Sequence, residues 1–475
     1  DPLARGPAAR TAFEASAPHD ARAPLRVLGE QALSRAAGAP LIAGNRVRLL
    51  RDAPENYAAW LDALEGARRS VHFEMYIFAD DVAGRRFADA LVACARRGVE
   101  VRLLLDWLGM LGEAGGAFRR RLADASVEVR TFNPFRFDSP LAWLRRNHRK
   151  TLVVDDRLGF VTGLCVADRW LGDPARGRPP WRDTGVELEG PAVPDLSAAF
   201  ARAWAQSGPP LPESRLPDRG SVAPAGDVAL RVVATEPSSA GNYRLDQLVA
   251  AVARERLWLT DAYFVGFPSY VEGLRAAARD GVDVRLLVPG RSDLGLVKRL
   301  GIAGYRPLLE GGVRVFEWNG PMLHAKTAVA DRRWCRVGSS NLNLASWIGN
   351  WELDVAIEDD GFAASLAAAF EEDLENATEV VLGERRRPPG RALQLRGTRE
   401  GSAVKTAGAL RLGNVVGAAL GGHRVLGRSE ATALVLPGLA LLAAAALFLL
   451  FPRAIAVPLA VVATWLGVSL LLAAA

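Results

Sequence analysis

The chain has 475 residues, of which 50% are hydrophobic and 24% are charged, and its net charge is +6. This length is sufficient for two or three domains with complete cores, and the composition excludes a largely disordered chain. An isoelectric point near 9.5 indicates anionic partners, either lipid headgroups or nucleic acid, and charge alone does not separate the two.

The first part of the chain indicates alternating strands and helices. Residues 1–40 are rich in Ala, Arg and Pro, and we expect a mobile lead-in with one short helix at 25–37. From residue 44 onward, apolar strands alternate with segments of helical spacing, the strands at 46–50, 70–78 and 99–106 and the helices at 57–68 and 83–97. Strands that are almost entirely apolar and are separated by helices predict a mostly parallel sheet covered on both faces.

Two strings in this region return later in the chain, at an offset of about 180 residues. ARRGVEVRLLL at 95–105 reappears as ARDGVDVRLLV at 278–288, and SVHFEMYIF at 70–78 is echoed by RLWLTDAYFV at 256–265. A repeat of this length predicts a duplicated domain rather than a solenoid. The predicted divisions are a lead-in at 1–40, a first lobe at 41–205, a linker at 206–227, a second lobe at 228–380, a basic linker with either an interfacial or an ordinary helix at 381–430, and a membrane segment at 431–475.

The carboxyl-terminal residues differ in kind from the rest. Residues 431–451 and 454–475 each provide about the 20 apolar residues that cross a hydrocarbon core, and neither contains a charge. Pro452 and Arg453 between them leave room for only a tight turn, so we expect two antiparallel transmembrane helices, with one long buried core helix as the alternative. The basic residues that precede this hairpin place the main body in the cytoplasm by the positive-inside rule.

The most informative feature is a motif, His-x-Lys-x-x-x-x-Asp, that occurs twice. Its residues are His148, Lys150 and Asp155 in the first copy and His324, Lys326 and Asp331 in the second, and these six are the predicted catalytic residues. The residues after each lysine are strand-like, so each histidine projects on the same side as its lysine. Each aspartate falls where its strand ends, and there it is available to fix a neighbouring turn or a basic side chain.

Each histidine–lysine pair is half of an anion site, and two halves related by pseudo-twofold symmetry would complete a site for one phosphate. One imidazole would attack phosphorus and form a phosphohistidine, while the other protonates the leaving alkoxide and later deprotonates the incoming alcohol or water. The lysines and nearby backbone amides would stabilise charge on the equatorial oxygens. We expect no metal and no other cofactor, because no ligand spacing for one is evident and because Cys94, Cys165 and Cys335 are dispersed and read as buried thiols.

Supporting residues follow each motif. A nucleophilic imidazole needs an acceptor on its second nitrogen, and each half supplies one candidate, Asp183 in WRDTGVELEG and Glu352 in GNWELDVAI. The string GSSNLN after the second motif has small polar residues that can approach phosphate oxygens closely, namely Ser339, Ser340 and Asn341. The same string is also an ordinary turn, so by itself it is a weak indication.

With these strings the sequence resembles the phospholipase D superfamily, and within it the bacterial cardiolipin synthases. The resemblance rests on the paired motifs and on the strings WRDTG and GSSNLN. It spans about residues 40–380. It implies two α/β lobes with the active site between them, a phosphohistidine intermediate and no metal. The resemblance also implies that His148 is the nucleophile and His324 the acid and base, whereas the symmetry of the motifs leaves this order open.

Two features depart from the family pattern. Where the family has Gly-Gly-x-Asn after the first motif, this chain has Thr162, Gly163, Leu164 and Cys165, so the amide that would match Asn341 is missing. Bacterial synthases of the family also carry membrane helices at the amino end, whereas the predicted hairpin lies at the carboxyl end. These departures bear on the phosphate contacts of one half and on topology more than on the chemistry.

The predicted fold is therefore two duplicated phospholipase D-like α/β lobes related by a pseudo-twofold axis, followed by a transmembrane helical hairpin. The predicted function is a membrane-anchored phosphatidyltransferase that forms cardiolipin from phosphatidylglycerol and a second phospholipid, in the bacterial inner membrane with its lobes on the cytoplasmic side. The alternatives are a phospholipase D that yields phosphatidic acid, a nuclease, which the hairpin disfavours, and an inactive lipid-binding scaffold. Phospholipids and the membrane are the expected partners, no nucleic acid is expected, and the oligomeric state is not given by the sequence.

Overall fold

The computed structural model describes residues 23–135, 145–237, 239–382 and Thr464. The chain divides into two compact units, residues 1–386 and 387–475, and every element named below belongs to the first. The predicted membrane hairpin lies outside the described residues, apart from Thr464, as does nearly all of the basic linker before it. Among the helices of the described part, none combines the length and the apolar character that crossing a bilayer requires.

The first lobe alternates strands with helices. After the amino-terminal helix α2 (Ala23–Ala37), its elements are β1 (Ile42–Arg51), α3 (Asp52–Gly66), β2 (Ser70–Met75), α4 (Val82–Arg96), β3 (Glu100–Asp106), α5 (Gly116–Asp124), β4 (Glu128–Phe132), β5 (Thr151–Val154), β6 (Leu158–Thr162), α6 (Asp168–Leu171), β7 (Thr184–Glu189) and α7 (Val193–Ala205). Short 3-10 helices lie at Pro174–Arg176, Glu213–Arg215 and Arg219–Ser221. The two helices predicted at 57–68 and 83–97 correspond to α3 and α4.

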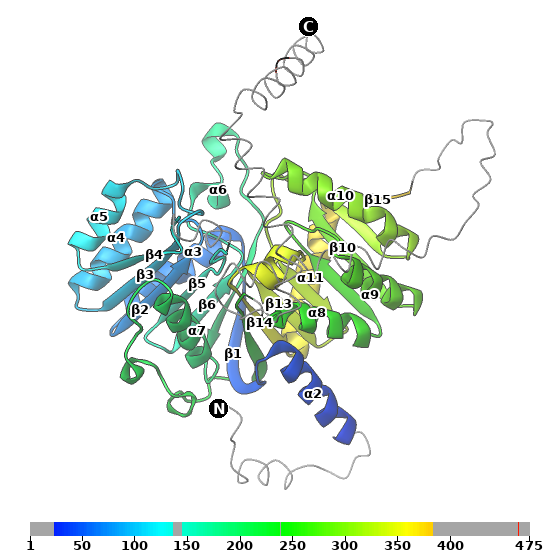
Figure 1. Ribbon diagram of the computed structural model, residues 1–475, viewed down its shortest axis with the longest axis horizontal. Coiled ribbons are helices and arrows are strands. Elements are labelled where there is room, and N and C mark those ends of the chain that lie inside the picture. The colour runs from blue at the N-terminus through cyan, green and yellow to red at the C-terminus, as the bar shows by residue number, and fades with distance from the viewer. Residues whose placement is uncertain (1–22, 136–144, 238, 383–463, 465–475) are drawn as a thin grey trace, which may run out of the picture. The chain divides into compact units, whose positions relative to one another are not determined.

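The second lobe repeats this order. Its elements are β8 (Val228–Thr235), α8 (Gly241–Val252), β9 (Arg256–Thr260), α9 (Pro268–Arg279), β10 (Asp283–Pro289), α10 (Gly295–Glu310), β11 (Arg314–Trp318), β12 (Thr327–Ala330), β13 (Trp334–Gly338), a π-helical turn (Ala345–Gly349), β14 (Glu352–Glu358), α11 (Asp360–Glu375) and β15 (Ala377–Val380). In Figure 1 the first lobe lies on the left of the view and the second on the right.

Short polar signals in the sequence set the ends of α4. The side chain of Asp81 at the N-cap accepts a hydrogen bond from the main-chain N–H of Gly84, which satisfies one of the free donors of the first turn. The helix ends just before Gly98, whose φ of 85° is in the left-handed region that favours glycine. The string Arg-Gly-Val after α4 therefore marks a helix end followed by a buried strand.

Among the described residues, fifteen strands form one sheet in the order β15-β11-β10-β9-β12-β13-β14-β8-β1-β7-β6-β5-β2-β3-β4. This order is symmetric about the β1–β8 pair, because each strand from β7 out to β4 has its counterpart from β14 out to β11. β15 is an additional edge strand. β1 and β8 pair antiparallel, with Ile42 opposite Leu230, as a twofold axis through the pair requires. The duplicated lobes thus share one continuous sheet.

The prediction of a mostly parallel sheet was wrong. Only β2, β3 and β4 and their counterparts β9, β10 and β11 run parallel to one another, while the strands between them pair antiparallel. The connections at 155–157 and 331–333 are three-residue turns, and turns of this length join only antiparallel neighbours. Every residue of β5 and β12 is buried, so their continuous apolar runs record burial on both faces and not strand direction.

Four apolar clusters make up the core of the described residues, and the smallest contains Phe200 and Trp204 of α7. One belongs to the first lobe and surrounds Trp60 of α3, which is fully buried and packs edge-on against Phe73 at 6.2 Å. The second belongs to the second lobe and contains Trp347. The third combines residues of both lobes with the inner faces of α7 and α11, including Leu196 and Phe370. The two lobes are therefore held together by shared apolar packing as well as by the β1–β8 pair.

The helix predicted in the lead-in is α2, and it is packed against the second lobe. Leu33 and Ala37 belong to the apolar cluster of that lobe, and Glu30 forms an ion pair with Arg231, whose side chain is fully buried. Arg231 also pairs with Glu358, so its buried guanidinium is neutralised by one carboxylate from α2 and one from β14. Residues 1–22 lie outside the described part.

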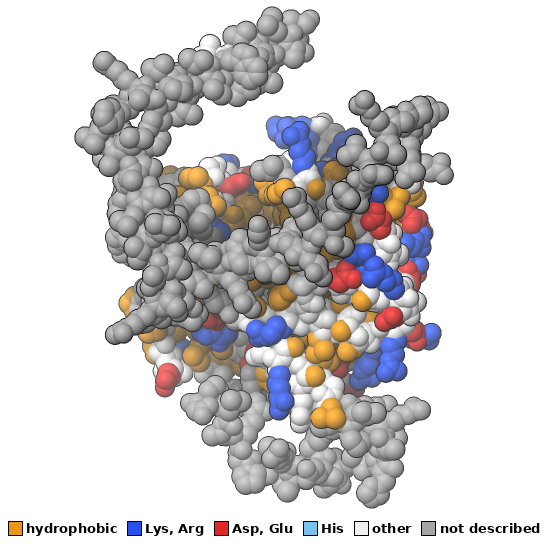
Figure 2. Space-filling view, turned by 45° about the vertical axis from the view of Figure 1, so that its right-hand side comes forward, with side chains coloured by type: hydrophobic (Ala, Val, Ile, Leu, Met, Phe, Trp, Pro, Cys, Tyr) orange, Lys and Arg blue, Asp and Glu red, His pale blue; other side chains and the backbone are white. Residues whose placement is uncertain are grey.

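The surface carries both signs of charge. Along the β1 and β11 strands, arginines pair with glutamates of neighbouring strands, as in Arg48–Glu187 and Arg314–Glu379. Figure 2 shows blue and red side chains interleaved on the face that it draws, with hydrophobic side chains between them. On the parts of this face that the described residues form, the basic side chains make no continuous surface of the kind that is the electrostatic footprint of nucleic-acid binding.

Candidate active site

The two motif histidines lie at the junction of the lobes, each just before the strand that separates the lysine of its motif from the aspartate. Both are buried, and each is tied to the other lobe through its main chain. The N–H of His148 donates to the carbonyl of Trp351 at 2.8 Å, and the N–H of His324 donates to the carbonyl of Arg182 at 2.7 Å. Short parallel bridges link the flanking residues at both places, so the two halves have the same geometry.

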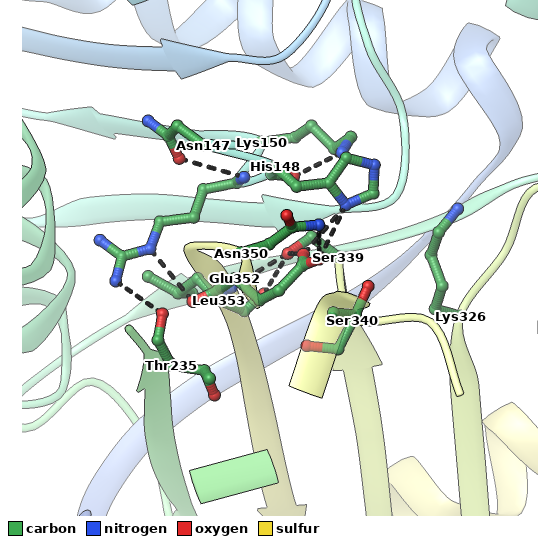
Figure 3. A network of polar contacts seen from close by, with 12 residues as sticks. Asn147, His148, Lys150, Thr235, Lys326, Ser339, Ser340, Asn350, Glu352 and Leu353 are labelled. Carbon is green, nitrogen blue, oxygen red and sulfur yellow. Dashed lines mark hydrogen bonds and ion pairs between the residues drawn. The ribbon is translucent and has the colours of Figure 1, made fainter. Parts of the chain in front are cut away.

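The imidazole–carboxylate pairs cross between the lobes. His148 Nδ1 lies 3.1 and 3.0 Å from the two carboxylate oxygens of Glu352, and His324 Nδ1 lies 2.8 Å from Asp183 Oδ2. Figure 3 shows the first of these pairs. From the sequence each half appeared to supply its own carboxylate, but the structure brings each carboxylate to the histidine of the other half. Neither lobe alone contains an oriented histidine.

Each carboxylate is held by further donors, and the two halves differ here. Glu352 also accepts a hydrogen bond of 2.6 Å from Ser339 Oγ, and Asp183 accepts one of 2.9 Å from Trp170 Nε1. The position that matches Ser339 in the first half is Gly163, and a Cβ built there would lie 2.2 Å from Asp183 Oδ1. The shorter carboxylate thus packs against a glycine, and the longer one meets a serine hydroxyl.

The two motif lysines are almost completely buried beside their histidines. Each Nζ donates to the main-chain carbonyl of its own histidine, and Lys326 Nζ also lies 2.9 Å from His324 Nδ1. In Figure 3 Lys326 projects from its strand toward the side on which the ring of His148 lies. Burial is the largest cause that lowers the pKa of both lysines, and it brings that of Lys326 to about 8.

Burial and neighbouring positive charge favour neutral imidazoles. Burial, followed by the charge of Lys326, lowers the pKa of His324 to about 3, and burial is also the main cause that lowers the pKa of His148. Burial alone would raise the pKa of Asp183 and Glu352, but their histidine partners and the lysines hold both below the usual range. Ionised carboxylates then accept Nδ1–H from neutral rings, which leaves each Nε2 with a lone pair.

Aromatic side chains that the sequence reasoning did not single out surround the two rings. Tyr76 packs edge-on against His148 with ring centroids 4.9 Å apart, and Tyr263 does the same to His324 at 5.7 Å. Trp170 and Trp181 also contact His324, at 5.4 and 5.7 Å. The tyrosines were detectable, because they occupy the same place in the echoed strings SVHFEMYIF and RLWLTDAYFV. The string RWLG at 169–172 is echoed by SWIG at 346–349, but Trp347 packs in the core of the second lobe and donates to Asp246.

Two carboxylates behind the tyrosines were also missed. Glu74 and Asp261 each stand two residues before a tyrosine and are fully buried. Glu74 accepts a hydrogen bond of 2.6 Å from Asn147 Nδ2, and Asp261 accepts one of 2.6 Å from the N–H of Leu342. These bonds hold the segments next to His148 and next to Asn341. Burial raises the pKa of Asp261 to about 7.

The motif aspartates lie away from the histidines, at the other end of their strands. Asp155 accepts hydrogen bonds from the main-chain N–H groups of residues 68–70, and Asp331 accepts them from those of residues 254–256. Seven residues of extended chain, about 23 Å, separate each from its histidine. Asp155 lines a separate cavity of about 1050 Å³ at that edge of the sheet. Both aspartates therefore fix neighbouring turns.

The predicted phosphate-binding residues have different surroundings. The hydroxyl of Ser339 is bonded to Glu352, and that of Ser340 to Asp354, so neither points freely toward a ligand. Asn341 is buried, and its Oδ1 has no hydrogen-bond partner among the described residues. Cys165 at the matching place in the first half is buried and unpaired, like the other two cysteines. Within the described ranges, no group of three or more His, Cys, Asp or Glu side chains is placed to hold a metal ion.

Comparison with known proteins gives a consistent result. Residues 60–168 and 249–374 match a family model described as cardiolipin synthase, PLD-like domain. Cardiolipin synthase A of Pseudomonas aeruginosa is 35% identical over 372 residues, which cover 75% of this chain and 73% of that protein. Cardiolipin synthase of Alkalihalophilus pseudofirmus is 30% identical over 72% of this chain and 68% of that protein. The crystal structure of phosphatidylserine synthase from Haemophilus influenzae covers 74% of this chain and 92% of its own, with a TM-score of 0.57 at 13% identity, a likeness of fold alone.

Proposed function

Since the chain belongs to the cardiolipin synthase branch of the phospholipase D superfamily and is an enzyme of the phosphatidyltransferase type, we propose that it forms cardiolipin from phosphatidylglycerol and a second phospholipid. The crossed imidazole–carboxylate pairs are the observation that carries this proposal. They supply two oriented rings, one from each lobe, beside two buried ammonium groups. That set of groups suits a double displacement at one phosphodiester and leaves no step that requires a metal.

In the first step, Nε2 of His148 attacks phosphorus. A nitrogen–phosphorus bond forms and the bond to the headgroup oxygen breaks, while His324 gives a proton to the departing alkoxide. The ring of His324 is neutral in the empty site, and the negative charge of a bound phosphodiester favours its protonation, so the ring takes up a proton from water when the substrate binds. Lys150 and Lys326 offset the charge on the equatorial oxygens.

In the second step, a hydroxyl of phosphatidylglycerol replaces the released alcohol. His324, now neutral, removes the proton of this hydroxyl, and the oxygen attacks the phosphatidyl-histidine. An oxygen–phosphorus bond forms, the bond to His148 breaks, and both rings return to their first state. Asp183 and Glu352 keep each Nδ1–H directed away from phosphorus in both steps. If phosphatidylglycerol is also the donor, the released alcohol is glycerol.

Anchoring in the bacterial inner membrane is part of the proposal. The two apolar, uncharged segments at 431–451 and 454–475 support it, because each has the length that a hydrocarbon core requires. The basic residues before them support a cytoplasmic position for the catalytic lobes. Phospholipids dissolved in the membrane are then substrates that the lobes reach from its surface.

The experiment is product analysis with the purified full-length chain in detergent micelles and phosphatidylglycerol labelled in its headgroup and its acyl chains. Cardiolipin with released glycerol is the expected result. Phosphatidic acid without cardiolipin would identify a hydrolase instead, and absence of turnover would contradict both. His324→Ala should abolish turnover, and a base-stable, acid-labile phosphate on His148 in that variant would identify the nucleophile. His72→Gln is the matched control, because His72 is buried against Phe200 and lies outside the site.

A further inference from the structure

Exposed apolar side chains gather at one edge of the sheet. Large hydrophobic side chains are usually buried, and eleven are exposed among the described residues. Six of these lie on both lobes around the edge at which the parallel strands end, and we call them the apolar rim: Val82, Leu111, Leu171, Leu294, Leu300 and Ile302. Their exposed fractions run from 37% for Leu171 to 75% for Val82.

Parts of the rim on both lobes lie next to residues of the candidate active site. Leu171 ends α6 next to Trp170, which contacts both His324 and Asp183. On the second lobe, a Cβ built on Gly301 would lie 2.6 Å from the main-chain oxygen of Phe264, so α10 lies directly against the residue that follows Tyr263. Leu300 and Ile302 flank this glycine. Figure 1 shows α6 and α10 at the same end of the molecule, near the top of the view.

Unpaired basic side chains accompany the rim. Arg119 and Arg120 of α5, Arg291 after β10 and Arg299 of α10 are exposed, and none forms an ion pair with a carboxylate in the described part of the chain.

Acidic residues at the same edge already accept hydrogen bonds or form ion pairs. Asp293 accepts from the Tyr263 hydroxyl, Glu113 pairs with Arg169, and Asp168 accepts from the N–H of Ala83. Asp168 and Asp293 keep their negative charge because their donors are neutral, but the four unpaired arginines outnumber them, so the balance of these groups is positive.

From this combination we infer that the apolar rim and its four arginines are the surface by which the catalytic lobes lie on an anionic bilayer. The inference rests on the proposed function. Removing a phospholipid from a membrane exposes its chains to water at about 0.8 kcal/mol per CH₂, so a buried site must receive the phosphate while the chains stay in the bilayer. Apolar and basic side chains that alternate beside the site fit that requirement. The apolar side chains enter the headgroup layer, and the guanidinium groups bind lipid phosphates.

The first test measures contact with the bilayer and does not depend on turnover. Because the three native cysteines are buried, an introduced exposed cysteine can be labelled selectively. Leu300→Cys and the control Val252→Cys, an exposed valine at the end of α8 and at the opposite edge, would each carry a polarity-sensitive fluorophore in the full-length chain. In proteoliposomes of phosphatidylcholine and phosphatidylglycerol containing spin-labelled lipid, quenching at 300 should exceed that at 252 at least threefold. Equal quenching at the two positions, or none at 300, would overturn the inference.

The second test separates bilayer contact from chemistry. Leu300→Asp with Ile302→Asp should lower turnover of long-chain phosphatidylglycerol in vesicles about tenfold, whereas turnover of a monomeric short-chain analogue should stay within twofold of wild type. Val252→Asp should change neither rate. An equal loss on both substrates, or no loss on vesicles, would contradict the inference. A wild-type chain inactive on both substrates would instead refute the proposed function, and the quenching result would still decide whether the rim contacts the bilayer.

Discussion

Replacing Asp331 by alanine should destabilise the protein and leave the chemistry of the folded molecule nearly unchanged. Oδ1 of Asp331 accepts from the N–H groups of Arg254, Glu255 and Arg256 at 3.0, 2.8 and 3.2 Å. Three such bonds at a partly exposed site are worth about 2 kcal/mol together. Asp331 also has a φ of 53°, in the left-handed region. Alanine in that conformation costs roughly 1 kcal/mol more than aspartate or asparagine, which adopt it more readily. The expected loss is about 3 kcal/mol, and about 1 kcal/mol for Asp331→Asn.

The assay pairs urea unfolding with turnover per folded molecule. Asp331→Ala should lower the unfolding midpoint clearly and keep kcat within about threefold of wild type. Asp155→Ala is the matched variant, because Asp155 binds the N–H groups of residues 68–70 in the same way and has a φ of 55°. A kcat reduced 100-fold at an unchanged midpoint would refute the reasoning and would make the motif aspartate part of the reaction.

Three further predictions concern the groups around the rings. Asp183→Asn and Glu352→Gln should each lower kcat about 10³-fold or more without unfolding the protein, as expected when an orienting carboxylate is lost; a near-normal rate for either would remove the crossed pairs from the mechanism. Gly163→Ala should resemble Asp183→Asn, because its Cβ would lie 2.2 Å from Asp183 Oδ1, and a fully active variant would contradict this. The kcat/KM profile should fall as the pH rises, because His324 is neutral in the free enzyme and must take up a proton, and the fall should steepen above about pH 8, because burial lowers the pKa of Lys326 to about 8 and its positive charge is lost as the pH rises through that value. An unchanged slope through pH 8 would show that this charge is not needed.

The order of elements was largely predictable, whereas strand direction was not. The echoed strings at 70–78 and 256–265 correctly indicated a duplication, because they cover the same strand and loop in each lobe. The nearly all-apolar strands at 46–50, 70–78 and 99–106 predicted a mostly parallel sheet, although burial on both faces gives the same pattern whatever the direction. The direction of β5 and β12 follows from the three-residue turns at 155–157 and 331–333, which join antiparallel neighbours.

The residue types of the site were visible in the sequence, but their pairing was not. His148 and Asp183 are separated by 35 positions of one lobe, so the sequence order favours a pair between them. The structure instead joins His148 to Glu352 across 204 positions. Such a contact depends on how two lobes meet at the β1–β8 pair, and no local periodicity or spacing encodes that junction. Trp181 was missed because no repeat points to it, and Trp170 was missed because it resembles Trp347, which is a core residue of the second lobe.

Because each carboxylate pairs with the histidine of the other lobe, the orientation of each imidazole depends on how the two lobes meet. The main-chain bonds from His148 to Trp351 and from His324 to Arg182 end one residue before the partner carboxylates, so the backbone that joins the lobes also positions the acceptors. A shift between the lobes would therefore disturb both rings together. The continuous sheet and the apolar cluster beneath α7 and α11 oppose such a shift. The two motifs can then keep identical chemistry while the surroundings of each ring diverge, as the glycine beside Asp183 and the serine beside Glu352 already do. That divergence allows two histidines with the same motif to take different parts in one reaction.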